Sequence, residues 1–154
     1  MREQAHSAGL GQGSTFEIRL PRIPAPQRAD ESVAPPGTPR RILIVDDNQD
    51  AADFLALLLK SEGHDVEVVY RSTEALERVA QRLPEVVLMD IGMPHMDGSA
   101  VARELRARHG DSLRVFALTG YGRPEDRERS DAAGFDAHLV KPVDVPTLLR
   151  HLAW

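Results

Sequence analysis

From residue 40 onward, five short apolar runs alternate with five segments that have the apolar spacing of helices. The runs read RILIV, DVEVVY, EVVLM, LRVFAL and FDAHLV. Strands that are each followed by a helix pack side by side in parallel, with helices over both faces of the sheet. Because such crossovers are right-handed, the sequence predicts an α/β fold: a doubly wound, five-stranded parallel sheet of strand order 2-1-3-4-5 with five helices.

The helical segments have recognisable starts and ends. Asn48 is expected to cap the first helix through its side-chain oxygen, and Gly63 is expected to end that helix. The apolar residues of this helix follow a 3, 4, 7 spacing and are expected to form one buried stripe, made of Ala51, Phe54, Leu55, Leu58 and Leu59. The fourth helix, expected over residues 122–134, is rich in charged side chains and should be the least buried.

Residues 1–39 differ in character from the rest of the chain. They hold six of the eleven prolines, and the stretch 23–39 has no apolar period of either kind, which is typical of a linker. Within residues 15–20, apolar and polar side chains alternate. This alternation predicts a single strand, without a partner in this chain.

The overall composition narrows the classes of function. The net charge of −5 argues against nucleic acid as a main partner, because a phosphate-binding surface needs an excess of Lys and Arg. The chain has no cysteine, which excludes disulfides and Cys-ligated zinc. No apolar run approaches about 18 residues, and the polar N-terminus lacks a signal-peptide core. We therefore expect a cytoplasmic protein without direct membrane contact.

Polar side chains follow four of the five predicted strands. Asp46 and Asp47 come after the first strand, Asp90 after the third, Thr119 after the fourth and Lys141 after the fifth. The carboxyl ends of parallel strands lie on one edge of the sheet, where ligands bind, so these side chains are expected to converge. Clustered carboxylates repel one another, and a bound dication would remove that repulsion.

An all-oxygen ligand set of this kind favours Mg²⁺ or Mn²⁺ over zinc. We predict a Mg²⁺ site in which Asp47 and Asp90 are direct ligands and Asp46 acts through water. The Gly92 carbonyl is the expected third protein ligand. Because Mg²⁺ keeps several positions free of protein ligands, a phosphoryl oxygen could bind there as well.

Asp90 is also the expected nucleophile, because it ends the central strand beside the metal and a carboxylate can form an acyl phosphate. Thr119 is expected to donate its hydroxyl to one phosphoryl oxygen, and Lys141 to pair with another. Phosphoryl transfer depends mainly on positioning and on neutralising charge, which is what these groups can supply.

The motifs ILIVDDN, VVLMDIGMPHMDG, ALTGYG and HLVKPV, spread over roughly residues 40–152, resemble the receiver domain of two-component response regulators. The resemblance implies a flavodoxin-like domain that takes a phosphoryl group from phosphohistidine onto aspartate. It implies that Asp90 is the phosphoacceptor, Asp46 and Asp47 are the acid pair for Mg²⁺, and Thr119 and Lys141 are the switch hydroxyl and the lysine of the site. It also implies a cis bond between Lys141 and Pro142.

The chain departs from the family at the strand-five position that usually holds Tyr or Phe, because His138 stands there. The usual coupling between the switch hydroxyl and an aromatic ring is therefore left open. Gly92 and Tyr121 match the variable positions that tune dephosphorylation in the family.

The N-terminal sequence GLGQGSTFEIRLP is similar to the end of a histidine-kinase ATP-binding domain. This resemblance implies a hybrid histidine kinase, with residues 1–22 as the remnant of its catalytic domain, 23–39 as a Pro-rich linker and 40–154 as the receiver. The other parts of an ATP site are missing, so we expect no useful ATP binding, and the chain is expected to be a phosphoacceptor module. The expected partners are a phosphohistidine-bearing kinase or a histidine phosphotransfer protein, and a weak homodimer is left open.

Three other functions remain open from the residues alone. The first is an aspartyl-phosphate phosphatase, although such enzymes resemble a pattern with two acids one residue apart after the first strand. The second is a flavin-binding module, for which the acidic DDNQD loop has the wrong charge. The third is an interaction domain that is not phosphorylated, against which the complete set of acids, hydroxyl and amine argues.

Overall fold

The computed structural model describes residues 3–7, 14–18, 37–93, 97–120 and 133–154. The chain divides into two compact units, Met1–Ala34 and Pro35–Trp154. Among the helices within the described ranges, none is long and apolar enough to cross a membrane.

The first unit contains a β-hairpin. Strand β1 (Glu3–Ser7) pairs antiparallel with strand β2 (Ser14–Ile18), so that Ala5 lies opposite Phe16. The prediction that the alternating segment has no partner in this chain is therefore wrong. The sequence of β1, EQAHS, is polar and lacks the β-branched residues that mark a strand, so only its pairing reveals it.

The second unit is a five-stranded parallel sheet of strand order β4-β3-β5-β6-β7, which confirms the predicted order 2-1-3-4-5. Its strands are β3 (Arg41–Val45), β4 (Asp65–Val69), β5 (Val86–Asp90), β6 (Arg114–Thr119) and β7 (Ala137–Val140). The described helices are α1 (Gln49–Ser61), α2 (Ser72–Gln81), α3 (Gly98–His109) and α5 (Val145–Leu152), with a short 3₁₀ turn over Gly110–Ser112. The expected fourth helix falls largely on residues 121–132, which lie outside the described residues.

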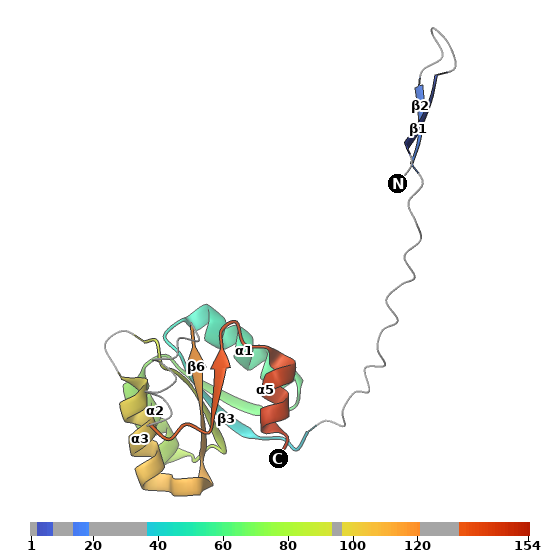
Figure 1. The fold of residues 1–154 in the computed structure, drawn as a ribbon. Coiled ribbons are helices and arrows are strands. Elements are labelled where there is room, and N and C mark those ends of the chain that lie inside the picture. The colour runs from blue at the N-terminus through green and yellow to red at the C-terminus, as the bar shows by residue number, and fades with distance from the viewer. Residues whose placement is uncertain (1–2, 8–13, 19–36, 94–96, 121–132) are drawn as a thin grey trace. The chain divides into compact units, whose positions relative to one another are not determined.

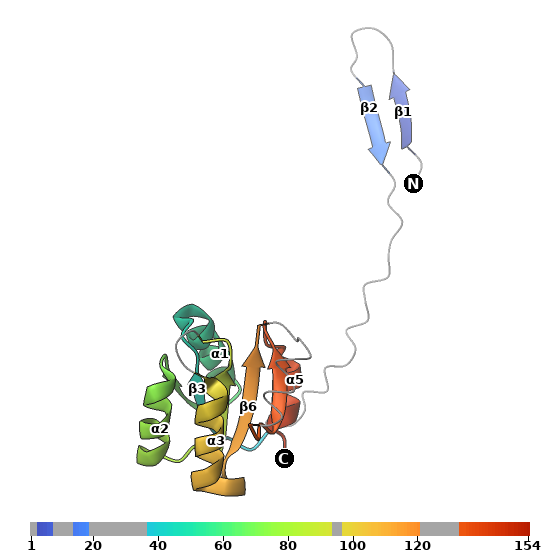
Figure 2. The ribbon, with the colours of Figure 1, turned by 60° about the vertical axis from the view of Figure 1, so that its left-hand side comes forward.

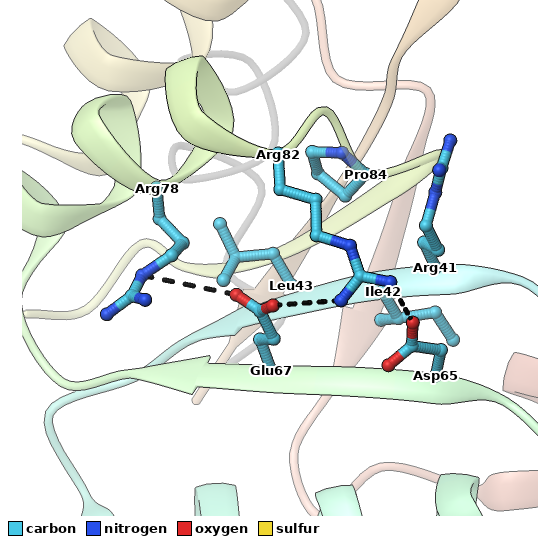
Figure 3. Close-up of a pocket in the computed structure, with 8 residues that line it drawn as sticks. All are labelled: Arg41, Ile42, Leu43, Asp65, Glu67, Arg78, Arg82 and Pro84. Carbon is cyan, nitrogen blue, oxygen red and sulfur yellow. Dashed lines mark hydrogen bonds and ion pairs between the residues drawn. The ribbon is translucent and has the colours of Figure 1, made fainter.

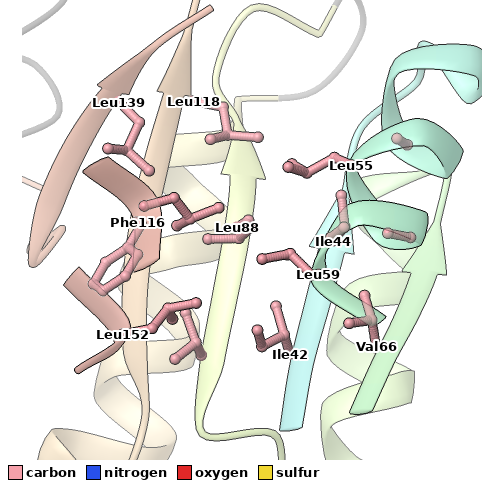
Figure 4. Close-up of a cluster of buried hydrophobic side chains, with 14 residues drawn as sticks. Ile42, Ile44, Leu55, Leu59, Val66, Leu88, Phe116, Leu118, Leu139 and Leu152 are labelled. Carbon is pink, nitrogen blue, oxygen red and sulfur yellow. The ribbon is translucent and has the colours of Figure 1, made fainter. Parts of the chain in front are cut away.

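Helices cover both faces of the sheet, as the doubly wound form requires (Figures 1 and 2). On one face, α1 and α5 pack on an apolar cluster that includes Leu59, Phe116 and Leu148 (Figure 4). On the other face, α2 and α3 pack on a second cluster that includes Met89 and Leu105. Strand β5 lies between β3 and β6, and all five of its residues are buried. The carboxyl end of β5 is thereby held from both sides.

Helix α1 begins as expected but is rotated relative to the predicted stripe. The Asn48 side chain caps it by accepting from the Ala51 amide at 3.2 Å. Leu55 and Leu59 are buried as predicted, but Ala51 is exposed and Phe54 is 63% exposed. The buried face is completed instead by two alanines of the same helix, Ala52 and Ala56. These small side chains form the contact face, and the row containing Phe54 turns outward.

At the amino ends of the strands, Arg40, which directly precedes β3, contacts Trp154 at the other end of the unit. Its guanidinium bonds Glu85 at 2.9 Å and the Trp154 carbonyl, and it lies 4.1 Å from the centroid of the Trp154 ring. Arg114, which begins β6, lies 3.9 Å from the same ring. The Trp154 ring is thus in contact with two guanidinium groups.

His64 in the same region makes stability depend on pH. It is 7% exposed, and its Nδ1 accepts from the Arg40 amide at 3.1 Å, which requires the neutral imidazole. Burial lowers the pKa of His64 below 6.5; the charge of Arg40 adds to this, while the carboxylates of Glu62 and Glu85 oppose it. As the pH falls through about 6.5, the unfolded chain takes up a proton first, so the folded state loses stability.

We therefore expect the free energy of unfolding to decrease between about pH 7.5 and about pH 5.5, by at most about 1.4 kcal/mol for each unit of pKa difference. Denaturant titrations of the wild type and of His64→Gln at both pH values measure this. Gln keeps an acceptor for the Arg40 amide but does not titrate. An equal pH dependence in the two proteins would show that His64 is not the responsible group.

Candidate functional site

The predicted residues come together at the carboxyl edge of the sheet. Asp46 follows β3, Asp90 is the last residue of β5, Thr119 is the last residue of β6 and Lys141 follows β7. Because the four strands are parallel and adjacent, their ends lie side by side. Residues that are up to 95 positions apart in the sequence are thus in direct contact.

Lys141 joins the two buried carboxylates. Its Nζ lies 2.7 Å from Asp46 Oδ2 and 2.9 Å from Asp90 Oδ2. The other oxygen of each acid accepts a backbone amide: Asn48 donates to Asp46 Oδ1 at 2.9 Å, and Gly92 donates to Asp90 Oδ1 at 2.8 Å. Each carboxylate is held through both of its oxygens, and its orientation is fixed before anything binds.

The two acids are in different surroundings from Asp47. Asp46 is 2% exposed and Asp90 is 6% exposed, whereas Asp47 is exposed. Burial raises the pKa of Asp90, although the bond from Lys141 and the Gly92 amide oppose the shift. Burial lowers the pKa of Lys141, but its bonds to Asp46 and Asp90 outweigh that effect, so its pKa is raised and it stays charged. The site therefore holds negative charge that one ammonium does not fully offset.

The acids form a donor set for a cation. Asp46, Asp47 and Asp90 can each offer one carboxylate oxygen, and these three oxygens lie within 4.8 Å of one another. Hard oxygen donors of this kind fit Mg²⁺, which needs only one or two carboxylates and completes its shell with water or phosphate. The predicted role of the Gly92 carbonyl as a ligand stays a prediction. A Cβ at position 92 would lie 3.3 Å from Asp90 Oδ1, so glycine keeps this approach uncrowded.

Thr119 and Lys141 are linked through the backbone as well. The Lys141 amide donates to the Thr119 carbonyl at 2.7 Å, which ties the end of β7 to the end of β6. Thr119 is 6% exposed. The Lys141–Pro142 bond is cis, as the resemblance implies. His138 is half-buried on β7, and the centroid of its ring lies 5.9 Å from that of Phe135. Tyr121 lies outside the described residues.

A cavity of about 460 Å³ opens beside the acidic site. Asp46 and Lys141 are among the residues that line it, and most of the others are apolar side chains of α1 and of the segment after β7. The lining residues are Asp46, Asn48, Ala51, Phe54, Leu55, Leu58, Leu118, Lys141, Pro142 and Val143. The helical period did not predict this cavity, because it assigned Phe54 to the core. The exposed Phe54 lines this cavity, which we call the groove, together with Lys141.

A second, much smaller cavity of about 10 Å³ lies by β4 and α2, near the starts of β3 and β4 (Figure 3). Its charged side chains pair with one another: Arg82 bonds Asp65 at 2.6 Å and Glu67 at 3.2 Å. A space of this volume holds about one water molecule. It is therefore a packing feature and offers no room for a ligand.

Comparison with known proteins gives one consistent family. The sequence model of the response regulator receiver domain family matches residues 42–153. An uncharacterised 14.6 kDa protein encoded in the sodA1 3′ region of Leptolyngbya boryana is 40% identical over 110 residues, which are 71% of this chain and 84% of that protein. Response regulator MprA of Mycobacterium sp. strain KMS is 36% identical over 74% of this chain, and the match spans only 49% of MprA.

Solved structures agree with the sequence relatives. A CheY-like response regulator receiver domain protein from Methanospirillum hungatei is 30% identical, with a TM-score of 0.68 over 75% of this chain and 91% of that chain. Chemotaxis protein CheY4 of Vibrio cholerae is 28% identical, with a TM-score of 0.69 over 74% of this chain and 96% of that chain. Both comparisons cover nearly the whole of the related chain and about three quarters of this one.

Proposed function

The chain belongs to the response regulator receiver domain family, and on that premise we propose that residues 40–154 accept a phosphoryl group from phosphohistidine onto Asp90 in a Mg²⁺-dependent reaction. The observation that supports this most is the bridge from Lys141 to both Asp46 and Asp90. In this proposal Asp90 is the acceptor, and the bridge supports it by holding Asp90, Asp46 and the Lys141 ammonium around one small space at the strand ends.

In the proposed reaction, one oxygen of the ionised Asp90 carboxylate attacks phosphorus. The new O–P bond forms as the N–P bond of phosphohistidine breaks, and the imidazole leaves with the electron pair and takes up a proton from water. The Gly92 amide holds Asp90 Oδ1, so the carboxylate presents itself in one orientation. A divalent cation on Asp46, Asp47 and Asp90 would supply positive charge next to the phosphoryl oxygens.

Lys141 has a separate role in this proposal. Before transfer its ammonium offsets the charge of Asp90, and after transfer it pairs with a phosphoryl oxygen. Thr119 donates its hydroxyl to another phosphoryl oxygen. Both groups belong to neighbouring strand ends that are hydrogen-bonded to each other, so they respond to the same event. A shift in their position would bias the domain between two states.

The proposal is tested by incubating the full chain with acetyl phosphate, with and without Mg²⁺. A single phosphoryl group should appear in the intact mass only when Mg²⁺ is present, and borohydride reduction should map it to Asp90 as an acyl phosphate. Sustained turnover of p-nitrophenyl phosphate would favour a phosphatase instead. Absence of labelling under all conditions would contradict the proposed function.

We also propose that the groove beside the site receives the phosphohistidine partner, a kinase or a histidine phosphotransfer protein. The groove has apolar walls and reaches Lys141, so a helix that carries phosphohistidine can rest apolar side chains on Phe54. The kinase remnant at residues 1–22, the linker at 23–39 and a cytoplasmic location remain parts of the same proposal.

Phe54→Ala is expected to slow phosphotransfer from a purified phosphohistidine protein about tenfold, because a large contact side chain is lost from the groove. Leu57→Ala is the matched control, since Leu57 is 65% exposed on the same helix but does not line the groove. Labelling by acetyl phosphate should be the same in both variants and in the wild type. Equal phosphotransfer rates in the two variants would argue against docking at the groove.

A further inference from the structure

Strand β7 positions Lys141, yet most of its side chains are only partly buried or exposed. It has four residues and pairs, in the part of the sheet that the structure describes, with β6 alone. All four residues are described, and among them Leu139 alone is buried, while Val140 is 54% exposed. A buried face specifies the register of a strand, and one buried side chain does so weakly. Polar contacts therefore have to contribute to the register of β7.

Asp136, the residue before β7, provides such contacts. Its backbone amide donates to the Val115 carbonyl at 2.8 Å, and its carboxylate accepts from the Val115 amide at 2.7 Å. Val115 is 1% exposed, so its amide would be left without a partner, away from water, if the carboxylate were removed. A shift of β7 by one residue along β6 would break both bonds.

Arg106 of α3 holds this carboxylate in place. Its Nη2 donates to Asp136 Oδ2 and, at 3.0 Å, to the Gly134 carbonyl. Its Nη1 donates to the carbonyls of Gly110 and Leu113 at 2.8 Å and 3.1 Å. A planar guanidinium can serve this fixed set of acceptors, whereas the single ammonium of lysine cannot span it. Arg106 thereby joins the end of α3, the approach to β6 and the start of β7.

The other end of β7 leads directly to the site. There the Lys141 amide bonds the Thr119 carbonyl, and Lys141 Nζ lies within 2.9 Å of both Asp46 and Asp90. A slip of one residue would move Lys141 by about 3.3 Å and reverse the face of the strand that it follows. Neither ion pair would survive such a displacement.

We propose that Arg106 and Asp136 are positioning residues for Lys141, acting through the register of β7 at the opposite end of the strand. The expected effect of this pair on phosphorylation rests on the proposed function of Asp90. The geometric part, that the pair fixes where Lys141 lies, holds independently of that chemistry.

The test compares Arg106→Gln and Asp136→Ala with Arg82→Gln in the full chain. Arg82, the residue that follows α2, bonds Asp65 on β4 at 2.6 Å, so it also joins the end of a helix to an edge strand of the described sheet but has no connection to Lys141 (Figure 3). The first measurement is hydrogen exchange at the Lys141 amide. We expect it to be about tenfold faster in both test variants and unchanged in Arg82→Gln.

The second measurement is labelling by acetyl phosphate at saturating Mg²⁺. The maximal rate constant is expected to fall about tenfold in the test variants, since a displaced catalytic group loses its alignment. The Mg²⁺ concentration for half-maximal labelling should not rise, because Asp46 and Asp47 follow β3, which the pair does not touch, and because displacing the Lys141 ammonium leaves the acids more negative. Arg106→Lys, which keeps the charge, should recover part of the rate and serves if the glutamine variant does not fold.

Each outcome decides a separate statement. Wild-type exchange and wild-type labelling in both test variants would overturn the positioning role and leave the proposed function standing. The same losses in Arg82→Gln would trace the effect to general destabilisation and would also overturn it. If the wild type is not labelled at all, the proposed function fails, and the exchange comparison still decides whether the pair positions Lys141.

Discussion

Replacing Asp90 by asparagine is expected to abolish labelling by acetyl phosphate and Mg²⁺. The amide is close to the carboxylate in shape but has no oxygen that can form a stable acyl phosphate. Asp90→Ala should give the same result and excludes deamidation of the new asparagine as a source of residual signal. Intact mass after a fixed incubation measures the phosphorylated fraction directly.

The fold should tolerate this change. Burial raises the pKa of Asp90 in the folded state, so its contribution to stability declines as the pH rises from about 3.8 through that raised value. At neutral pH an uncharged group at position 90 removes this cost, and the free energy of unfolding should not be lower than that of the wild type. Asp47→Asn is the control for metal binding. This variant keeps the phosphoacceptor Asp90 but loses one carboxylate of the metal site, so its labelling should recover as the Mg²⁺ concentration is increased. Undiminished labelling of Asp90→Asn would contradict the assignment.

Lys141→Met is expected to lower both stability and reactivity. Two nearly buried carboxylates, Asp46 and Asp90, would lose the ammonium that lies between them. Removing one partner of a buried ion pair costs about 3 kcal/mol, here somewhat less because Lys141 retains some exposure. The rate of labelling should fall about 100-fold, as when a charged group that faces the transition state is removed.

The metal ion distinguishes these two losses. Millimolar Mg²⁺ should restore much of the stability of Lys141→Met, since a cation on the same acids offsets their repulsion. It should not restore the labelling rate, because the ammonium that would pair with the phosphoryl oxygen is still absent. Urea titrations with and without Mg²⁺, alongside labelling rates, measure both. If Mg²⁺ stabilises the variant no more than the wild type, the three acids do not share one ion.

The sequence was sufficient for the strand order and for the residues at the strand ends. Once five strands were known to be parallel, Asp46, Asp90 and Lys141 had to lie on one edge, whatever their separation along the chain. Their distances could not be predicted, because they depend on how far each loop returns over the edge. The bond from the Gly92 amide to Asp90 Oδ1 is an example: it follows from loop geometry and has no sequence pattern of its own.

Two other features were beyond the reach of the sequence. Helical spacing reported that α1 has an apolar side, but it could not decide whether the row of Phe54 or the row of Ala52 faces the sheet. Arg106 was equally hidden, because three of its acceptors are backbone carbonyls, which every residue has. Contacts between a side chain and distant main chain become visible only when the segments are placed in space.

The sole tryptophan of the chain gives the protein an internal optical probe. Trp154 sits against Arg40 and Arg114 at the amino ends of the strands, so a five-residue strand separates it from the acidic edge by about 15 Å. Its fluorescence emission should therefore report unfolding of the domain and should not change when a cation binds to the carboxylates. Fluorescence-detected unfolding curves recorded with and without magnesium can then share one folded baseline, and the difference in their midpoints reads out ion affinity without any added dye.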